Sequence, residues 1–588
     1  MKSFLIYKYI LIISISFTLC IYGDSNINEY QEKKSKPSSS CIGQELVVDY
    51  LVLGAGTAGS IMASKLSEDS DTTVLLVERG EWDTDPNIYN TSQWLTWFRN
   101  PNPRFSHNYY GDAEPQLGGR KMKNPLATFV GGCSGHNAMV ANSGSARFDF
   151  DLWAHFTGSE NNWSGDIARE NLIELNKIMQ FQGMDRNRTW MPELAKAIES
   201  LGYKPNDGRF MELDATGYST RQFWYTRGDM KRTTTYSRML KDNGALQNRD
   251  NLDIIVNHRA VELEYEPIGR DNGHFPGHDR RFGEEEQSTT STTPTTKDPM
   301  FRVAGVWIQN TETMRKTFIR VQRELIVSMG AIESPKFLQL NGIGDKRHLT
   351  SLGIETVVNS PWVGKHLQDH VFLKVRGKRL ASHLQDTVIP LRNPIFDGYQ
   401  VFGPRNASVI GNKYSVAIDV ARDDKGFAIL DFTLESNRPL SRGFVKITSR
   451  DPYANPQILT NFFSNPIDME YMIDGIRECL LIQEEMAKMG LLDPSSTSDL
   501  PLNATRQQYI DFVTQKGVSD SHLTGSIRMG PDKDTASPLD GDLRVKGLKN
   551  VRVVDASVFP SIPGSPNTSV PVSLIALQAF KIIKNQNK

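Results

Sequence analysis

The clearest hydrophobic pattern in the chain lies near its N-terminal end, where two apolar runs flank a glycine-rich turn and a helical segment. Residues 50–53 (YLVL) have the length and composition of a buried strand, and residues 61–66 (IMASKL) begin a helical pattern. A second apolar run, residues 74–77 (VLLV), ends in Glu78. Short continuous apolar runs are typical of strands buried on both faces. The pattern therefore predicts a strand–helix–strand unit at the start of an α/β domain.

The same pattern predicts further elements along the chain. Apolar runs predict strands at 251–256, 260–265, 301–308, 325–328 and 551–555, and helical periodicity predicts helices at 167–181, 469–486 and 570–583. By contrast, residues 82–119 contain few periodic runs, and we expect them to form an extended loop over the glycine-rich turn that follows residue 53. Residues 267–299 are polar and of low complexity, which predicts a disordered surface loop.

Length and composition restrict the class of protein. At 588 residues the chain is too long for a single core, so two or three domains are expected. Its content of 38% hydrophobic and 23% charged residues is that of a soluble globular protein. A net charge of -1 gives no reason to expect nucleic acid or an anionic membrane as a partner.

The N-terminal residues have the pattern of a secretory signal. Lys2 and Lys8 accompany an apolar stretch over residues 10–22 that is too short to span a bilayer. We expect residues 1–23 to be a cleaved signal peptide and residues 24–45 a disordered segment, with no membrane anchor; an uncleaved anchor is the alternative. Secretion agrees with five candidate sites of N-glycosylation, at Asn90, Asn162, Asn187, Asn406 and Asn503.

The cysteines define neither a disulfide framework nor a metal site. Cys20 lies in the expected signal, which leaves Cys41, Cys133 and Cys479 and therefore at most one bridge. The spacing of cysteines and histidines does not match a metal-binding pattern, so no metal is expected.

Three glycines in the first turn form the pattern G-x-G-x-x-G, at Gly54, Gly56 and Gly59. Gly54 permits the tight turn out of the strand, Gly56 lets the backbone approach a pyrophosphate, and Gly59 allows close packing of helix on strand. The N-terminus of the helix that follows offers free N–H groups and the positive end of its dipole. Glu78, about 20 residues after Gly59, is placed to hold ribose hydroxyls. This pattern predicts a dinucleotide site, with NAD and FAD both open at this point.

A second glycine-rich segment, FVGGCSGHNAM, occupies residues 129–139. Gly131, Gly132 and Ser134 precede an apolar helix start. They form a further place where backbone N–H groups can meet a ligand.

Four separated segments together resemble the glucose–methanol–choline (GMC) flavin oxidoreductases. They are residues 49–80, the Gly-Gly-Cys-Ser-Gly-His-Asn loop at 131–137, the Gly-Ala-Ile-Glu-Ser-Pro signature at 330–335 with 342–344, and a stretch from His522 through Asp555 to Asn567. They follow the family's order and span nearly all of the chain after residue 45. The resemblance implies FAD rather than NAD as the cofactor.

The fold implied by the resemblance is α/β: a Rossmann-like FAD-binding domain with an inserted α+β substrate-binding domain, of the p-hydroxybenzoate hydroxylase-like type. The FAD-binding domain would comprise residues 46–148, 233–344 and 520–588. The substrate domain would comprise residues 149–232 and 345–519.

The resemblance also implies the catalytic residues. His522 stands in the family's catalytic-base position, where an imidazole can accept the hydroxyl proton of an alcohol. A structural histidine is the alternative. Asn567 stands in the second catalytic position, where an amide N–H would stabilise a developing alkoxide. The alternative for Asn567 is a glycosylation site, because Thr568 and Ser569 follow it.

Further residues are implied to contact FAD. His136 resembles the histidine that binds FAD covalently in the choline oxidase branch of the family; a noncovalent histidine beside the ring is the alternative. The implied cofactor residues are Gly54, Gly56, Thr57, Gly59, Glu78, Gly131, Gly132, Ser134, His136, Asn137, Ala138, Ala260, Asp555, Ala556 and Thr568.

The chain departs from the choline oxidase branch within the substrate pocket. That branch has a proline and then a glutamate that holds the trimethylammonium group, where this chain has Val371 and Phe372. A cation in a dry pocket needs a counter-charge or an aromatic cage. Phe372 therefore predicts a neutral, apolar or aromatic alcohol, such as a benzylic alcohol or a cyanohydrin, over choline or a sugar.

Together these features predict a secreted FAD-dependent alcohol oxidase that forms a carbonyl compound and passes electrons to dioxygen, giving hydrogen peroxide. A dehydrogenase with a quinone acceptor and a non-redox hydroxynitrile lyase on the same scaffold are the alternatives. A secreted binding protein derived from an enzyme is disfavoured, because His522, Asn567 and the glycine turns are intact.

Overall fold

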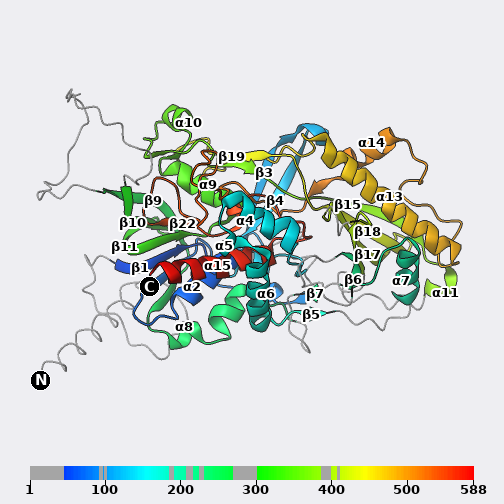
Figure 1. The fold of residues 1–588 in the computed structure, drawn as a ribbon, viewed down its shortest axis with the longest axis horizontal. Coiled ribbons are helices and arrows are strands. Elements are labelled where there is room, and N and C mark those ends of the chain that lie inside the picture. Colours follow the sequence, from blue (N-terminus) through cyan, green and yellow to red (C-terminus); the bar gives the residue numbers. More distant parts are fainter. Residues whose placement is uncertain are drawn as a thin grey trace, which may run out of the picture.

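A computed structural model describes residues 46–91, 97, 102–183, 191–206, 216–220, 222–223, 231–268, 301–385, 399–406 and 411–587. Two large sheets lie at opposite ends of the molecule (Figure 1). The first has seven strands in the order β8-β2-β1-β11-β10-β9, with β22 beside β11. Their bounds are β1 Leu46–Leu53, β2 Val74–Val77, β8 Leu252–Ile255, β9 His258–Pro267, β10 Phe301–Asn310, β11 Lys316–Val327 and β22 Val551–Val553.

The centre of the first sheet is parallel. β1 pairs in parallel with β2 on one side and with β11 on the other, and β2 and β11 pair in parallel with β8 and β22. All four residues of β2 are buried, as expected for a strand covered on both faces. The antiparallel strands β9 and β10 extend one edge. Helices α2 (Thr57–Leu66), α15 (Ser569–Gln586) and α6 (Gly165–Met179) pack against one another beside this sheet.

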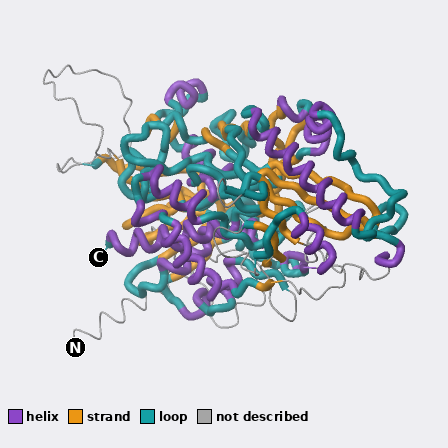
Figure 2. The backbone as a smooth tube through the Cα atoms, turned by 45° about the vertical axis from the view of Figure 1, so that its right-hand side comes forward, coloured by secondary structure: helices purple, strands orange, loops and turns teal. Residues whose placement is uncertain are grey.

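The second sheet is antiparallel, in the order β21-β15-β18-β17-β16-β6. Its strands are β6 Gly217–Thr220, β15 Val371–Arg379, β16 Tyr399–Gly403, β17 Tyr414–Arg422, β18 Ala428–Ser436 and β21 Val518–Ser519. Helix α13 (Pro466–Lys488) crosses one face, and α7 (Met191–Ser200) and α14 (Arg506–Lys516) pack against it (Figures 1 and 2). Leu373 and Val375 of β15 share a buried apolar cluster with Met472 and Ile476 of α13. The opposite face of the sheet, which carries Phe372, is therefore the face that α13 leaves open.

The hairpin of β3 (Ser106–Glu114) and β4 (Arg120–Ala127) corrects one prediction, because residues 82–119 were expected to form a loop. These strands are too polar to show an apolar run, but Tyr109 of β3 is buried in a cluster with Ala331 and Leu367. Tertiary packing, not local periodicity, makes this segment a strand. A three-stranded sheet of β14 (Lys365–Leu367), β19 (Gly443–Lys446) and β20 (Gln457–Leu459) packs beside it and against α9 (Gly330–Leu340).

The shorter elements connect these layers. They are α4 Asp151–Thr157, α5 Glu160–Trp163, α8 Ala245–Asn248, α10 Lys346–Ser351, α11 Ser382–Gln385, β5 Gln182–Gly183, β7 Gln222–Phe223, β12 Ile343–Gly344 and β13 Val358–Asn359.

The predicted fold class, an α/β Rossmann-like FAD-binding domain with an inserted α+β domain, is confirmed. Every strand of the first sheet comes from residues 46–148, 233–344 or 520–588, and every strand of the second from 149–232 or 345–519. The predicted signal peptide, the segment 24–45 and residues 269–299 of the predicted insert lie outside the described residues. Within the described part of the chain, every helix is too short or too polar to cross a bilayer.

The packing of α13 on the second sheet provides a stability test. Ile476 is completely buried in this interface, so Ile476→Ala should lower the free energy of unfolding by about 2–5 kcal/mol, measured by urea denaturation. Ile467→Ala on the same helix is the matched control, because Ile467 is 45% exposed and its loss should cost less than about 0.5 kcal/mol. Equal effects of the two substitutions would contradict the packing described here.

Candidate active site

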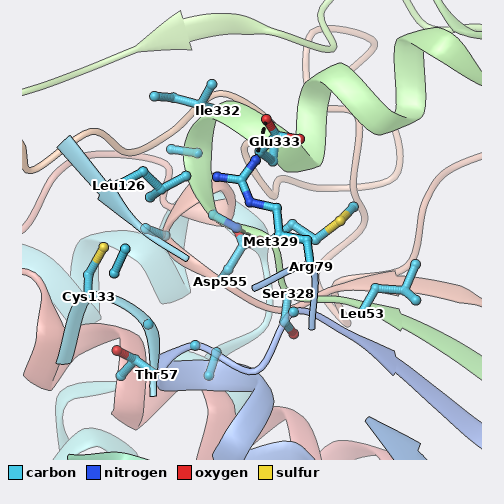
Figure 3. Close-up of a pocket in the computed structure, with 18 of the residues that line it drawn as sticks. Leu53, Thr57, Arg79, Leu126, Cys133, Ser328, Met329, Ile332, Glu333 and Asp555 are labelled. Carbon is cyan, nitrogen blue, oxygen red and sulfur yellow. Dashed lines mark hydrogen bonds and ion pairs between the residues drawn. The ribbon is translucent and has the colours of Figure 1, made fainter. Parts of the chain in front are cut away.

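A cavity with about 1400 Å³ of empty space, including its open mouth, lies where three helices begin (Figure 3). Gly54, Gly56, Thr57 and Ala58 bring the turn between β1 and α2 to its wall, and residues 328–333 bring the start of α9. Residues 555–556 and the start of α15 at residues 568–569 also line it. The end of β4 and residues 132–133 complete the lining described here.

Two glycines allow the predicted turns to meet at the cavity. A Cβ on Gly132, whose φ is +54°, would lie 2.6 Å from the Cα of Gly56, so this close approach of two backbones requires glycine. A Cβ on Gly56 itself would meet nothing within 4 Å, because that side faces the cavity. The two turns are also joined by a hydrogen bond, in which Gly131 N–H donates to the Ala55 carbonyl over 2.8 Å. Gly59 lies inside α2 against Gly54.

The start of α2 has the properties of an anion site. Gly56 stands at its N-cap position and no side chain caps the helix, so its first N–H groups are not satisfied by a side-chain cap. The pyrophosphate of a dinucleotide would supply the missing acceptors at the positive end of the helix dipole. The uncapped helix beside the open face of Gly56 fits FAD.

Glu78 is held in place by two backbone hydrogen bonds at the end of β2. Its Oε2 accepts from Ala55 N–H and its Oε1 from Gly80 N–H, both over 2.9 Å. Burial raises the pKa of this carboxyl group, while the two N–H donors and the nearby Arg79 act in the opposite direction. Glu78 and Ala260 both line the cavity, at the end where the resemblance places the adenosine ribose.

Asp555 lines the cavity, but both of its carboxylate oxygens accept hydrogen bonds from other residues of the protein. Oδ2 accepts from Gly330 N–H over 2.8 Å and from the Ser334 hydroxyl over 2.6 Å, and Oδ1 accepts from the backbone and side chain of Ser557. Asp555 thereby joins the start of α9 to the loop that carries Ala556. The geometry gives it the task of shaping the wall around the cofactor.

A buried ionic cluster on the cavity wall could not be predicted from the sequence. Arg79 Nη1 lies 3.0 Å from Oε1 of Glu333, and Arg259 Nη1 lies 2.9 Å from Oε2 (Figure 3 shows Arg79 pointing at Glu333). Lys336 and the hydroxyl of Tyr109 also contact this carboxylate. Burial alone would raise the pKa of Glu333, but the three cations hold it well below its usual range. One carboxylate among three cations leaves this wall positive.

The segment 131–138 is fastened to α15. Asn137 Nδ2 donates to the Ser569 hydroxyl over 3.0 Å, and its Oδ1 accepts from Nη1 of the buried Arg232 over 2.8 Å. Ser134 donates to the Gly131 carbonyl over 2.6 Å, and Ala138 packs against the core of the first domain. Of the segment's predicted cofactor residues, Gly132 lines the cavity.

His136 is buried beside the same segment. Its ring lies edge-on to Trp97, with the ring centres 6.2 Å apart. Burial, assisted by Arg232 and Lys123, lowers the pKa of His136 to about 3, so the imidazole is neutral at physiological pH. His136 is not among the residues that line the cavity.

His522 lies beside the cavity, between its lining residues Ser521 and Leu523, and its side chain is 18% exposed. Its backbone N–H donates to Oδ1 of Asp369 over 2.8 Å. Its ring Nδ1 lies 3.1 Å from Nδ1 of His370, 3.4 Å from Oε1 of Glu435 and 3.4 Å from Oδ2 of Asp520. Burial lowers the pKa of His522, but Asp520, Glu435 and Asp369 outweigh burial and raise it to about 9.

Asn567 lies one residue before the N-cap of α15 and holds the start of this helix. Its Oδ1 accepts from Ser569 N–H over 2.9 Å and from Val570 N–H over 3.4 Å, and its Nδ2 donates to the Val140 carbonyl. The described hydrogen bonds use one of the two N–H groups of this amide. A buried side chain in these contacts is a poor acceptor for a glycan. Among the described contacts, no hydrogen bond joins Asn567 to His522.

Phe372 stands directly opposite Glu435 in the pairing of β15 with β18. Directly paired residues of an antiparallel sheet project from the same face. Because Glu435 contacts the ring of His522, Phe372 lies on the face of the second sheet that is turned toward the catalytic position.

The fold and the cavity define a dinucleotide-binding flavoprotein, and comparison with known proteins establishes the family. Two models described as GMC oxidoreductase match residues 48–372 and 439–576. The chain belongs to the GMC oxidoreductase family, as predicted. It is an FAD-dependent enzyme that oxidises CH–OH groups.

Individual relatives match over most of their length. Choline oxidase from Arthrobacter globiformis is 28% identical over 545 residues, which are 89% of this chain and 92% of the relative. Among solved structures, formate oxidase has a TM-score of 0.75 at 22% identity, and a fungal aryl-alcohol oxidase has a TM-score of 0.71 at 19% identity. Each alignment covers 92% of this chain and 99% of the other, and at these identities it shows the fold alone.

The placement of the FAD pyrophosphate beside Gly56 and the uncapped start of α2 can be tested by filling this part of the cavity. Gly56→Val should fold, since the added atoms enter empty space, but they would occupy the position of the pyrophosphate. We expect the affinity for FAD to fall at least about tenfold, a loss of about 1.4 kcal/mol in binding, so that the flavin content per protein chain falls. The ratio of flavin to protein absorbance measures this, with circular dichroism as the control for folding. A variant with full flavin content would contradict this placement of the cofactor.

Proposed function

We propose that this protein is a secreted oxidase that converts a neutral, apolar or aromatic alcohol to its carbonyl compound and reduces dioxygen to hydrogen peroxide. The single observation that carries the proposal is the position of His522. It is a histidine at the cavity edge whose Nδ1 is held by buried groups, which leaves Nε2 as the ring atom for substrate. The bound flavin supplies the hydride acceptor.

The residues of the chain supply the proton chemistry and the orientation of the substrate. His522 Nε2 accepts the hydroxyl proton of the alcohol, and the free N–H of Asn567 stabilises oxyanion character. Phe372 offers an apolar contact on the open face of the second sheet. Phe372 favours a neutral substrate, because its ring alone cannot balance a cation fully.

One observation favours a second candidate, a cationic alcohol. The buried carboxylate of Glu435, in strand β18, lies directly opposite Phe372 in strand β15. Phe372 occupies the position at which the choline oxidase branch has its glutamate. Both imidazoles already contact Oε1 of Glu435, which is why we rank the neutral alcohol first.

A panel of benzyl alcohol, mandelonitrile, glucose and choline separates these substrates. We expect peroxide release with benzyl alcohol, and His522→Ala should lower the turnover rate by about 10²–10⁴, the usual contribution of a general base, at unchanged flavin content. Flavin bleaching without peroxide would identify a dehydrogenase, and cleavage of mandelonitrile without bleaching a lyase. A His522→Ala enzyme that keeps most of its activity would show that the base is another group.

The raised pKa of His522 predicts the pH dependence. The base must be unprotonated to accept the hydroxyl proton, and with a pKa of about 9 most of the histidine is protonated at neutral pH. The value of kcat/KM should therefore rise about tenfold per pH unit below this pKa and level off above it. A profile that falls between pH 7 and pH 9 would mean that the imidazolium is the active form.

We also propose that FAD is bound covalently through His136. The support is a neutral imidazole, which is the nucleophilic form, in the segment that contains Gly132 at the cavity wall. After acid precipitation of the wild-type protein, the flavin should stay in the pellet, and a tryptic peptide with His136 should carry the mass of FAD. His136→Asn should release the flavin. Flavin entirely in the wild-type supernatant would reject the linkage.

The secreted location rests on the N-terminal pattern and the glycosylation sites. Asn90, Asn406 and Asn503 are exposed, as glycan acceptors must be. Asn162 is half-buried, and its Nδ2 donates to Asp542 over 2.9 Å, which disfavours modification there. Asn187 lies outside the described residues.

A further inference from the structure

Three buried groups from distant parts of the chain converge on one point behind His522. His370 directly precedes β15, Glu435 lies in β18, and His522 follows β21. Oε1 of Glu435 lies 2.8 Å from Nδ1 of His370 and 3.4 Å from Nδ1 of His522, and the two Nδ1 atoms are 3.1 Å apart. Oε1 of Glu435 is fully buried, and none of its contacts has the geometry of a hydrogen bond. Its partners are the two imidazole rings, both at ion-pair distance.

A hydrogen bond at Nε2 of His370 helps to locate the protons on the two imidazole rings. Nε2 of His370 is 3.1 Å from the backbone carbonyl of Asn437, and a carbonyl only accepts, so Nε2 carries a hydrogen. Nδ1 of His370 lies 2.8 Å from the Glu435 oxygen, too close for two atoms that both lack a hydrogen, so a hydrogen lies between them. The same oxygen faces Nδ1 of His522 over 3.4 Å. A hydrogen on Nδ1 of His522 gives the carboxylate its second donor.

We propose that Glu435 is the positioning residue for His522: together with His370 it fixes the Nδ1–H tautomer and stabilises the imidazolium that forms when Nε2 accepts the substrate's proton. The inference rests on the proposed function, in which His522 is the base. In this step the alcohol O–H bond breaks and the Nε2–H bond forms. The ring gains one positive charge, opposite the Glu435 carboxylate, and the alcohol oxygen keeps the bonding electron pair. A carboxylate behind a catalytic histidine has these two effects in other enzymes.

Two further acids face His522, and their protonation differs from that of Glu435. Burial raises the pKa of Asp369 to about 7 and that of Asp520 well above its usual value. Burial also acts to raise the pKa of Glu435, but its contacts with His370 and His522 outweigh burial and lower it to about 2. Of the three carboxylates, Glu435 is the one whose pKa is lowered and the one that both imidazoles contact. It is therefore the carboxylate that stays ionised opposite His522 when the neighbouring acids take up protons.

The test compares three variants of the flavin-loaded enzyme. Glu435→Gln keeps the size of the side chain but removes its charge, and Glu435→Asp keeps the charge. Glu478→Gln is the matched control, because Glu478 is an equally buried carboxylate of the same domain, paired with Arg405 over 3.0 Å. The first readout is NMR titration of enzyme labelled with ¹³C-histidine, with His522→Gln to assign the signal. The second is the pH profile of kcat/KM.

In Glu435→Gln we expect the pKa of His522 to fall by at least about one unit, in the titration and in the pH profile alike. The limiting kcat/KM should fall about 10- to 100-fold, the usual cost of losing a group that orients a functional histidine. Glu435→Asp should restore most of the pKa and part of the rate, and Glu478→Gln should change neither. A structural role alone would change stability without moving this pKa.

Two results would overturn the inference. One is a His522 that titrates in Glu435→Gln at the wild-type pH. The other is a stoichiometric metal ion in the purified holoenzyme. His370, Glu435 and His522 each offer one ligand atom within 4.8 Å of the others, and a bound cation would then take the place of the shared proton. If no alcohol reduces the flavin in the wild-type enzyme, the proposed function fails. The NMR titration still decides whether Glu435 controls the proton on His522.

Discussion

The close approach of Gly56 and Gly132 is the contact on which the rest of the site depends. A side chain on Gly132 would collide with the backbone of Gly56, and a side chain on Gly56 would enter the cavity. The parallel pairing of β1 with β2 and β11 sets the position of the first turn, and the hydrogen bond from Gly131 to Ala55 sets the second against it. Because the two turns meet without side chains, the uncapped start of α2 stays open to the cavity.

The second sheet brings His522 two of its partners. His522 belongs to the C-terminal segment, but His370 and Glu435 reach it from the start of β15 and the end of β18, which are neighbouring strands. Helix α13 packs on the far face of this sheet, while the near face carries Phe372 beside Glu435. One part of the chain thus forms most of the cavity wall, and the other contributes groups that contact the ring of His522.

Much of the first domain could be predicted from local patterns. The apolar runs around Gly54 and the run at residues 551–555 became strands β1, β2 and β22, because continuous burial leaves a clear signal in sequence. The hairpin at residues 106–127 was missed, since its strands are mostly polar and their few buried apolar residues, such as Tyr109 and Met122, belong to different clusters. Short-range motifs likewise placed Glu78, Thr57 and Thr568 at the cavity.

Residues that act through long-range contacts left no such signal. Glu333 lies inside a recognised motif, yet its three cationic partners come from other segments of the chain. His370 directly precedes the strand that carries Phe372, but its contact with Glu435 depends on strand pairing that no spacing reveals. The same pairing places the carboxylate of Glu435 directly opposite Phe372.

The most direct measurement of the central claim is the reductive half-reaction without oxygen. Purified holoenzyme is mixed anaerobically with benzyl alcohol and with its α-deuterated form, and the flavin absorbance is followed in a stopped-flow instrument. We expect complete loss of the oxidised flavin band, at a slower rate with the deuterated alcohol, because a carbon–hydrogen bond breaks. An oxidised spectrum that stays unchanged at saturating concentrations of every alcohol in the panel would contradict it.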